Sequence, residues 1–155
     1  MILKPTNLKF VNRSWLAILL ISACVSGPHF YLQYGNEYRE VDLERILADN
    51  PFAAGENIKV ANLGRSASAS QHVVQIRDRE VLHVHNIHDA TVTMMRGQGY
   101  LFLADKRVNL KAGDIVHVQR GVPHRYVNTA SEPTVLLAVY SPPFDGKDNI
   151  PVDGQ

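Results

Sequence analysis

The sequence GDIVHVQRGVPHRYVN, residues 113–128, contains two short runs of β-forming residues with turn residues between them. Residues 114–119 and residues 124–128 are the two runs, and Gly121 lies in the break. Short runs of this kind, bounded by turn residues, are typical of β-strands. The stretch therefore predicts two strands, and it places His124 at the beginning of the second one.

The same pattern continues on both sides of this stretch. Runs of β-forming residues recur at 58–63, 72–77, 81–85, 90–95, 99–103, 106–110, 114–119, 124–128 and 134–140. About nine short strands in one domain indicate an all-β sandwich or barrel. The segment before them differs, because Leu43, Ile46 and Leu47 have the spacing of one helical face. Pro51 follows, so the sequence predicts one short helix over residues 41–48.

The octapeptide LHVHNIHD, residues 82–89, contains three of the seven histidines of the chain. His83 and His85 lie two positions apart in a strand-like run, and side chains in a strand alternate between its two faces. Both imidazoles should therefore point the same way, and two neutral nitrogen donors on one face are half of a metal site. By itself this motif is weak evidence, because His-x-His often arises by chance.

Together the two stretches resemble the two motifs of the cupins, which are small jelly-roll barrels whose motifs meet across the barrel interior. The first motif runs from a glycine through His-x-His and a glutamate to another glycine, and three of its positions are present: His83, His85 and Gly97. The second has fixed spacings of Gly, Pro-x-Gly, His and Asn, with Gln119 replacing the proline here and four positions present: Gly113, Gly121, His124 and Asn128.

This resemblance implies a cupin-type jelly-roll barrel over residues 58–145, followed by a C-terminal tail at residues 146–155. It also implies that His83, His85 and His124 are the ligands of a divalent metal ion. The reasoning from the residues agrees, because three imidazoles that converge inside a barrel have few other uses.

The fourth ligand of the cupin motif, a glutamate, is missing from this chain. Counting back from Gly97 by the family spacing leads to Ala90, which cannot bind a metal ion. Three alternatives remain for the fourth position: Asp89 reaching in from a loop or bulge, His88 doing so, or water. The spacing also resembles the pirin branch of the superfamily, in which a glutamate follows the third histidine by two positions. This chain has Tyr126 there.

Three neutral histidines leave a divalent ion with its full charge and with open coordination positions. Such a site favours carboxylates, diketones and vicinal hydroxyls, and it suits Fe, Mn, Ni, Cu or Zn without a choice among them. We therefore expect a metal-binding protein that holds a small anionic or bidentate oxygen ligand. The alternative is a metal-dependent dioxygenase, or an isomerase or lyase, acting on a small diketone, hydroxy-aromatic or hydroxy-acid.

Three further side chains fall on predicted strands. Tyr126 shares the alternation of His124, so it is a candidate donor to a bound oxygen or, equally, a wall tyrosine with a satisfied hydroxyl. His72 and His117 are expected to be polar wall residues or partners of the ligands rather than ligands themselves.

The first 23 residues have the pattern of an export signal. Three basic residues precede an apolar run, residues 15–21, that is too short to span a bilayer as a mature helix. The run leads into Ile-Ser-Ala-Cys, which resembles the lipobox of bacterial lipoproteins, and Cys24 is the only cysteine of the chain. The resemblance implies that Cys24 is lipidated and becomes the new N-terminus, anchoring the protein to a membrane. The alternative is a buried cysteine inside an uncleaved signal anchor.

Removal of residues 1–23 would leave 13 Lys+Arg and 15 Asp+Glu, a formal charge of −2. No basic block survives, which argues against a nucleic-acid partner. Residues 24–57 are then expected to form a tether and the short helix. The predicted protein is exported, lies in the bacterial cell envelope, and binds a small molecule, while a homodimer is left open.

Overall fold

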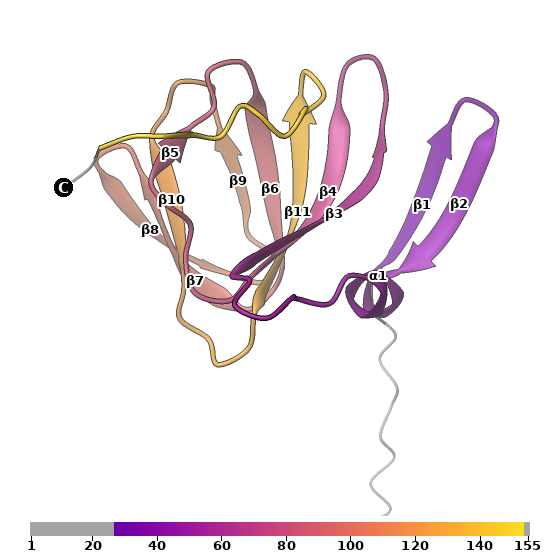
Figure 1. The fold of residues 1–155 in the computed structure, drawn as a ribbon, viewed down its shortest axis with the longest axis horizontal. Coiled ribbons are helices and arrows are strands. Elements are labelled where there is room, and N and C mark those ends of the chain that lie inside the picture. The colour runs from indigo at the N-terminus through magenta and orange to yellow at the C-terminus, as the bar shows by residue number, and fades with distance from the viewer. Residues whose placement is uncertain (1–26, 154–155) are drawn as a thin grey trace, which may run out of the picture.

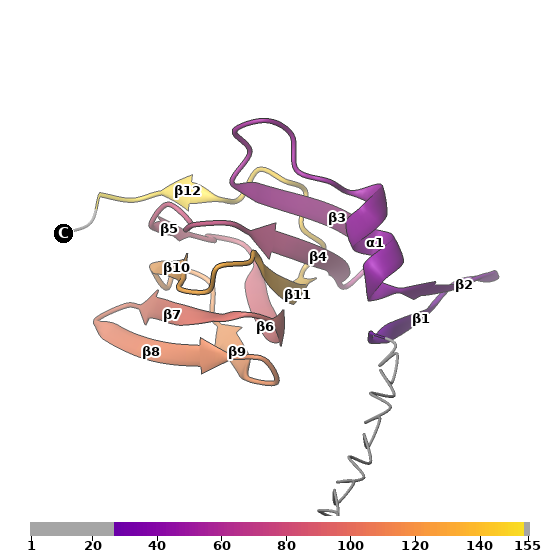
Figure 2. The ribbon, with the colours of Figure 1, turned by 90° about the horizontal axis from the view of Figure 1, so that it is seen from below.

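The computed structural model describes residues 27–153, which form two antiparallel five-stranded sheets packed face to face (Figure 1). One sheet has the strand order β12 (Ile150–Pro151), β5 (His83–Val84), β10 (His124–Asn128), β7 (Gln98–Leu103) and β8 (Lys106–Lys111). The other has the order β3 (Ile58–Arg65), β4 (Ser70–Ile76), β11 (Thr134–Ser141), β6 (Asp89–Arg96) and β9 (Ile115–Val118). In Figure 2 the strands of the first sheet lie one below another in this order from top to bottom.

Strand alternation builds the core between the two sheets. Val74 of β4 and Leu136 of β11 point inward from one sheet, and Leu101 of β7 and Tyr126 of β10 meet them from the other. Successive side chains of β4 point to opposite faces of the sheet, so Val73 points outward and belongs to a second cluster on the outer side. The predicted all-β jelly roll is therefore confirmed, and all nine predicted strands are present with bounds shifted by at most a few residues.

The expectation of a barrel needs one correction. Strands β12 and β8 end one sheet and β3 and β9 end the other, and no hydrogen-bonded pairing joins these ends within residues 27–153. The fold of this part is therefore a two-layer jelly-roll sandwich with open edges.

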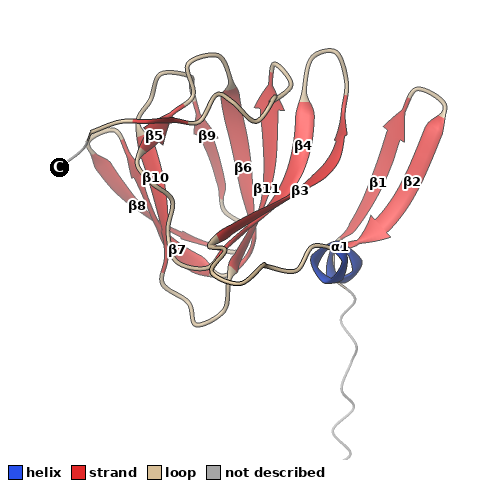
Figure 3. Cartoon of the chain, in the orientation of Figure 1, coloured by secondary structure: helices blue, strands red, loops and turns tan. Residues whose placement is uncertain are grey.

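A hairpin and the single helix of the described chain cover the outer face of the second sheet (Figure 3). Strands β1 (His29–Tyr34) and β2 (Glu37–Asp42) pair in register, and α1 (Leu43–Asp49) follows directly. Asp42 caps the helix, because its carboxylate accepts a hydrogen bond from the backbone N–H of Arg45. The helix was predicted. The hairpin was not, because residues 24–57 were expected to form only a tether and that helix.

The described part of the C-terminal segment crosses the end of the first sheet. Its short strand β12 pairs with β5, which brings this segment beside the first histidine motif. Among residues 27–153, no helix is long and apolar enough to cross a membrane. Cys24 and the predicted export signal lie outside the described residues.

Candidate metal centre

The three predicted histidine ligands come together at one end of the sandwich interior. His83 of β5 and His124 of β10 are directly opposite partners in the antiparallel pairing of these strands, so their side chains leave the same face of the sheet. His85 lies two positions after His83 and therefore points the same way. All three are buried, with exposed fractions of 4% to 6%.

The ring nitrogens are close enough to share one ion. One nitrogen from each ring lies within 4.8 Å of the others, and the ring centroids are 4.2, 5.0 and 5.1 Å apart. Two nitrogens bound to one ion at about 2.1 Å are at most about 4.2 Å apart. The rings would therefore turn inward to bind a common ion.

Hydrogen bonds fix which nitrogen of each ring faces the centre. Nδ1 of His83 donates to the carbonyl of Val81 at 2.8 Å, and Nδ1 of His124 donates to the carbonyl of Val122 at 2.9 Å. Nδ1 of His85 donates to the carbonyl of Asp148. Because a carbonyl can only accept, each Nδ1 carries the hydrogen and each Nε2 of the neutral ring keeps a free lone pair. This is the arrangement that metal-binding histidines adopt.

Burial keeps these histidines neutral. Loss of solvation lowers the pKa of His83 and His85 from the ordinary value of 6.5. At His124 burial and, to a smaller extent, the neighbouring His83 lower the pKa to about 4. Since neutral imidazole is the form that binds metal ions, the cluster is in its binding form at neutral pH.

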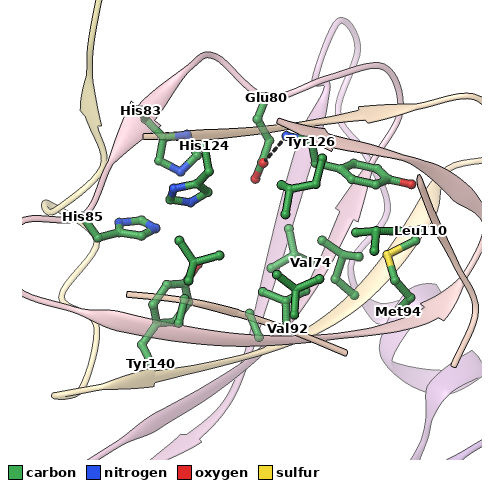
Figure 4. A pocket seen from close by; sticks show the side chains of 16 residues that line it. Val74, Glu80, His83, His85, Val92, Met94, Leu110, His124, Tyr126 and Tyr140 are labelled. Carbon is green, nitrogen blue, oxygen red and sulfur yellow. Dashed lines mark hydrogen bonds between the residues drawn. The ribbon is translucent and has the colours of Figure 1, made fainter. Parts of the chain in front are cut away.

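The cluster closes one end of a cavity of about 60 Å³ between the sheets. In Figure 4 the three rings face one another at this end, and apolar side chains, among them Val74, Val92 and Leu110, form the other end. A second, outer pocket of about 160 Å³ shares His83 and His85 with the inner cavity. The site is therefore a mostly apolar chamber with polar groups gathered around the three imidazoles.

Glu80 is the carboxylate of this chamber, and the sequence interpretation missed it. Its side chain lies beside the imidazoles (Figure 4), and its Oε2 accepts a hydrogen bond of 2.9 Å from the backbone N–H of Tyr126. Burial raises the pKa of Glu80, while this hydrogen bond and the charge interaction with His85 oppose the rise. No oxygen of Glu80 belongs to the group of possible ligand atoms that lie within 4.8 Å of one another, so Glu80 lies beside the candidate ligands rather than among them.

Asp148 connects the C-terminal segment to the histidine motif. Its buried carboxylate accepts hydrogen bonds from the backbone N–H groups of Asn86, Ile87 and His88 at 2.8 to 3.1 Å. It also accepts a bond of 2.6 Å from Nδ1 of His88. Burial alone would raise the pKa of Asp148, but these hydrogen bonds outweigh it and hold the pKa well below its usual range. The same residue's carbonyl orients His85, so Asp148 supports the metal centre.

The structure places neither Asp89 nor His88 in the cluster. The carboxylate of Asp89 is bound to Arg120, with Oδ2 at 2.9 Å from Nη2, and the hydrogen bonds from Arg120 lower the pKa of Asp89 to about 2. Its neighbour Ala90 lines the cavity instead, as strand alternation requires. His88 uses Nδ1 on Asp148, and its Nε2 lies 3.3 Å from the carbonyl of Pro143. Both side chains are therefore engaged away from the three clustered rings.

Tyr126, the candidate catalytic donor, points away from the histidines. Its ring lies toward the apolar end of the cavity (Figure 4), and its hydroxyl is 2.9 Å from Oγ1 of Thr134. It is thus a wall tyrosine with a satisfied hydroxyl. Tyr140 approaches the cluster more closely, with its ring centroid 5.4 Å from that of His85.

Two further strand histidines, His72 and His117, lie outside the cluster. His72 is buried in the wall of the outer pocket and has Nε2 at 2.9 Å from Oγ of Ser70. His117 is exposed on β9, where its Nδ1 is 3.1 Å from Oγ1 of Thr91.

Comparison with known proteins identifies the family. The cupin-domain family model matches residues 72–140, which include all three clustered histidines. An uncharacterized protein of Aquifex aeolicus is 39% identical over 112 residues, which are 72% of this chain and 91% of that protein. This chain is a cupin. A second relative of this cupin, an uncharacterized protein of Methanocaldococcus jannaschii, is 24% identical over 55% of the chain and 68% of that protein.

Solved structures show the same fold as this cupin. TT1209 of Thermus thermophilus matches with a TM-score of 0.58 at 22% identity, over 67% of this chain and 97% of that one. A Klebsiella pneumoniae protein with a double-stranded β-helix domain matches with a TM-score of 0.57 at 19% identity, over 70% and 94% of the two chains. KdgF of Halomonas sp. has a TM-score of 0.57 at 18% identity, over 64% and 94%. At these identities the likeness concerns the fold alone.

Proposed function

We propose that this cupin binds one divalent metal ion through His83, His85 and His124 and holds a small anionic or bidentate oxygen ligand at that ion. The observation that carries the proposal is the common orientation of the three rings. Each Nδ1 is used on a backbone carbonyl, which leaves three neutral Nε2 donors facing one space. Three such donors suit Fe, Mn, Ni, Cu or Zn and leave coordination positions for a ligand.

The chain's own residues would select the ligand. When bound, the ion supplies a double positive charge that polarises an oxygen ligand. Its protein ligands are neutral, so an anionic oxygen ligand is favoured over a neutral one. The apolar side chains of the chamber, such as Val74 and Val92, limit access of water and so strengthen that attraction.

Metal titration of the purified protein tests this proposal. We expect one equivalent of Zn(II) or Co(II) to bind, and His83→Ala and His124→Ala to weaken binding by at least about 100-fold. His117→Ala is the matched control, because His117 is an exposed strand histidine outside the cluster. Equal metal affinity of the wild type and of both cluster variants would refute the site.

A second candidate function is a metal-dependent dioxygenase, or an isomerase or lyase, acting on a small diketone, hydroxy-aromatic or hydroxy-acid. Glu80 favours this candidate, because it places a carboxylate beside the cluster in a chain that lacks the glutamate of the family motif. Such a carboxylate can hydrogen-bond to a ligand at the ion and exchange a proton with it. Oxygen uptake and ligand turnover by the metal-loaded protein, compared with Glu80→Gln, test this candidate.

We also propose that the protein is an exported lipoprotein anchored through Cys24. The support is the sequence alone: the basic start, the short apolar run and the lipobox-like Ile-Ser-Ala-Cys at residues 21–24. The anchored domain would then face the bacterial envelope and meet small molecules there.

A further inference from the structure

The outer pocket, here called the vestibule, leads from the open edge of the sandwich to the metal centre. It has a volume of about 160 Å³, and its inner wall includes His83, His85 and Glu80. The rest of its wall is mainly apolar and comes from β3, β4, β11 and the segments before β5 and after β11: Ile58, Val60, Val74, Val81, Tyr140 and Phe144.

The apolar side chains at the rim of the vestibule are exposed to solvent and do not belong to the hydrophobic core. Val60 has an exposed fraction of 52% and Val81 of 69%, and neither belongs to the two hydrophobic clusters that hold the sheets together. Phe144 lies further in, where its ring stacks on Tyr140 with centroids 4.7 Å apart and stands edge-on to His85 at 5.7 Å. A continuous apolar wall thus runs from solvent to the imidazoles.

The sizes of the two spaces limit what can bind. The inner cavity of about 60 Å³ has room for a few water molecules or a small head group, but not for a ring. The vestibule of about 160 Å³ is close to the volume of an apolar cavity, about 150 Å³, that is known to hold one benzene molecule. A ligand with a ring must therefore place the ring in the vestibule and only its head group at the ion.

We propose that the ligand is a small organic anion with an apolar body the size of one six-membered ring and a chelating pair of oxygens. The oxygens bind the ion held by the three histidines, and the body lies against Val60, Val81 and Phe144. This inference rests on the proposed metal-dependent ligand binding and adds the chemistry of the ligand's body to it. A purely hydrophilic ligand such as a sugar acid would leave this apolar wall without a partner.

Two β-diketones with the same chelating head group test the proposal on the Zn(II)- or Co(II)-loaded protein. Acetylacetone carries a second methyl group where benzoylacetone carries a phenyl ring. We expect calorimetry to show that benzoylacetone binds at least about tenfold more tightly, because its ring buries apolar surface against the wall of the vestibule. In Val60→Asp, a charged group replaces part of the exposed rim, and this tenfold preference should disappear.

Ile115→Asp is the matched control, because Ile115 is 68% exposed on β9 and does not line the vestibule. It should keep the preference for benzoylacetone. Equal binding of the two diketones by the metal-loaded wild type would overturn the vestibule proposal while leaving metal-dependent ligand binding intact. If neither diketone binds although the metal does, both the vestibule proposal and the proposed oxygen-ligand function are overturned.

Discussion

Replacement of Asp148 by alanine removes one carboxylate that holds four hydrogen-bond donors beside the metal centre. Oδ1 accepts from the backbone of Asn86, and Oδ2 accepts from the backbone of Ile87 and from the backbone and ring of His88. The side chain of Asp148 is only 6% exposed, so water replaces these bonds poorly. Leaving a buried hydrogen-bond donor without its acceptor costs about 1–3 kcal/mol, so the loss of the shared carboxylate should cost at least about 3 kcal/mol in all. We expect Asp148→Ala to lower the free energy of unfolding of the metal-free protein by about this amount.

The same substitution should weaken metal binding. The carbonyl of Asp148 accepts from Nδ1 of His85, and the side chain anchors that carbonyl by tying its segment to residues 86–88. Loss of a group that orients a metal ligand typically reduces metal affinity about 10–100-fold. Asp148→Asn should give a smaller loss, because the amide keeps one acceptor oxygen.

Urea unfolding and calorimetric Zn(II) titration measure the two effects separately. Asp145→Ala is the matched control, because Asp145 lies in the same segment but is exposed and accepts one bond from the backbone of Lys147. If folded Asp148→Ala binds Zn(II) within twofold of the wild type, the positioning role of Asp148 is wrong.

Four other results are expected. Glu80→Gln should preserve Zn(II) binding within a few-fold by calorimetry, and a 100-fold loss would instead make Glu80 a ligand. As the pH falls from about 6.5 to about 4, the metal-free protein should lose up to about 3 kcal/mol of its unfolding free energy. The reason is that His124 takes up a proton in the unfolded chain but not in the folded protein, where burial lowers its pKa to about 4. An unfolding free energy from urea titration that stays constant over this range, or an equal loss in His124→Gln, would argue against this. Gly99→Ala should be strongly destabilising in thermal melts, since its Cβ would collide with the backbone oxygen of Val127; a melting temperature like that of the wild type would contradict this. Cys24→Ser should move the protein from the membrane fraction to the soluble fraction in a bacterial host, and an unchanged distribution would refute the lipid anchor.

The sequence was sufficient for the parts of the fold that depend on local patterns. The alternation of His83 and His85 predicted that their rings point the same way, because side-chain direction in a strand has a period of two residues. The resemblance to the cupin motifs implied that His124 joins them, and the structure pairs His124 with His83. The same rule of alternation accounts for the direction of the Asp89 side chain. It neighbours Ala90, which faces the cavity, and therefore points to the other side of β6, toward Arg120.

The remaining features depend on contacts between distant segments. Glu80 ends the charged run of residues 77–80, which resembles a solvated turn, and it becomes half-buried where β10 packs beside it. Asp148 lies 63 positions from His85, and no periodic pattern links them. The missed hairpin did have a local signal, since Gly35-Asn36 is a pair typical of tight hairpin turns, and Gly35 has a positive φ of 62°.

X-ray absorption fine structure of the Zn(II)-loaded protein tests the central claim most directly, because it reports the atoms bound to the ion. We predict three imidazole nitrogens at about 2.0–2.1 Å, with the remaining positions filled by oxygen, and a loss of one imidazole in His124→Ala. A shell made of oxygen alone, or an unchanged shell in that variant, would contradict the claim that His83, His85 and His124 together hold the metal.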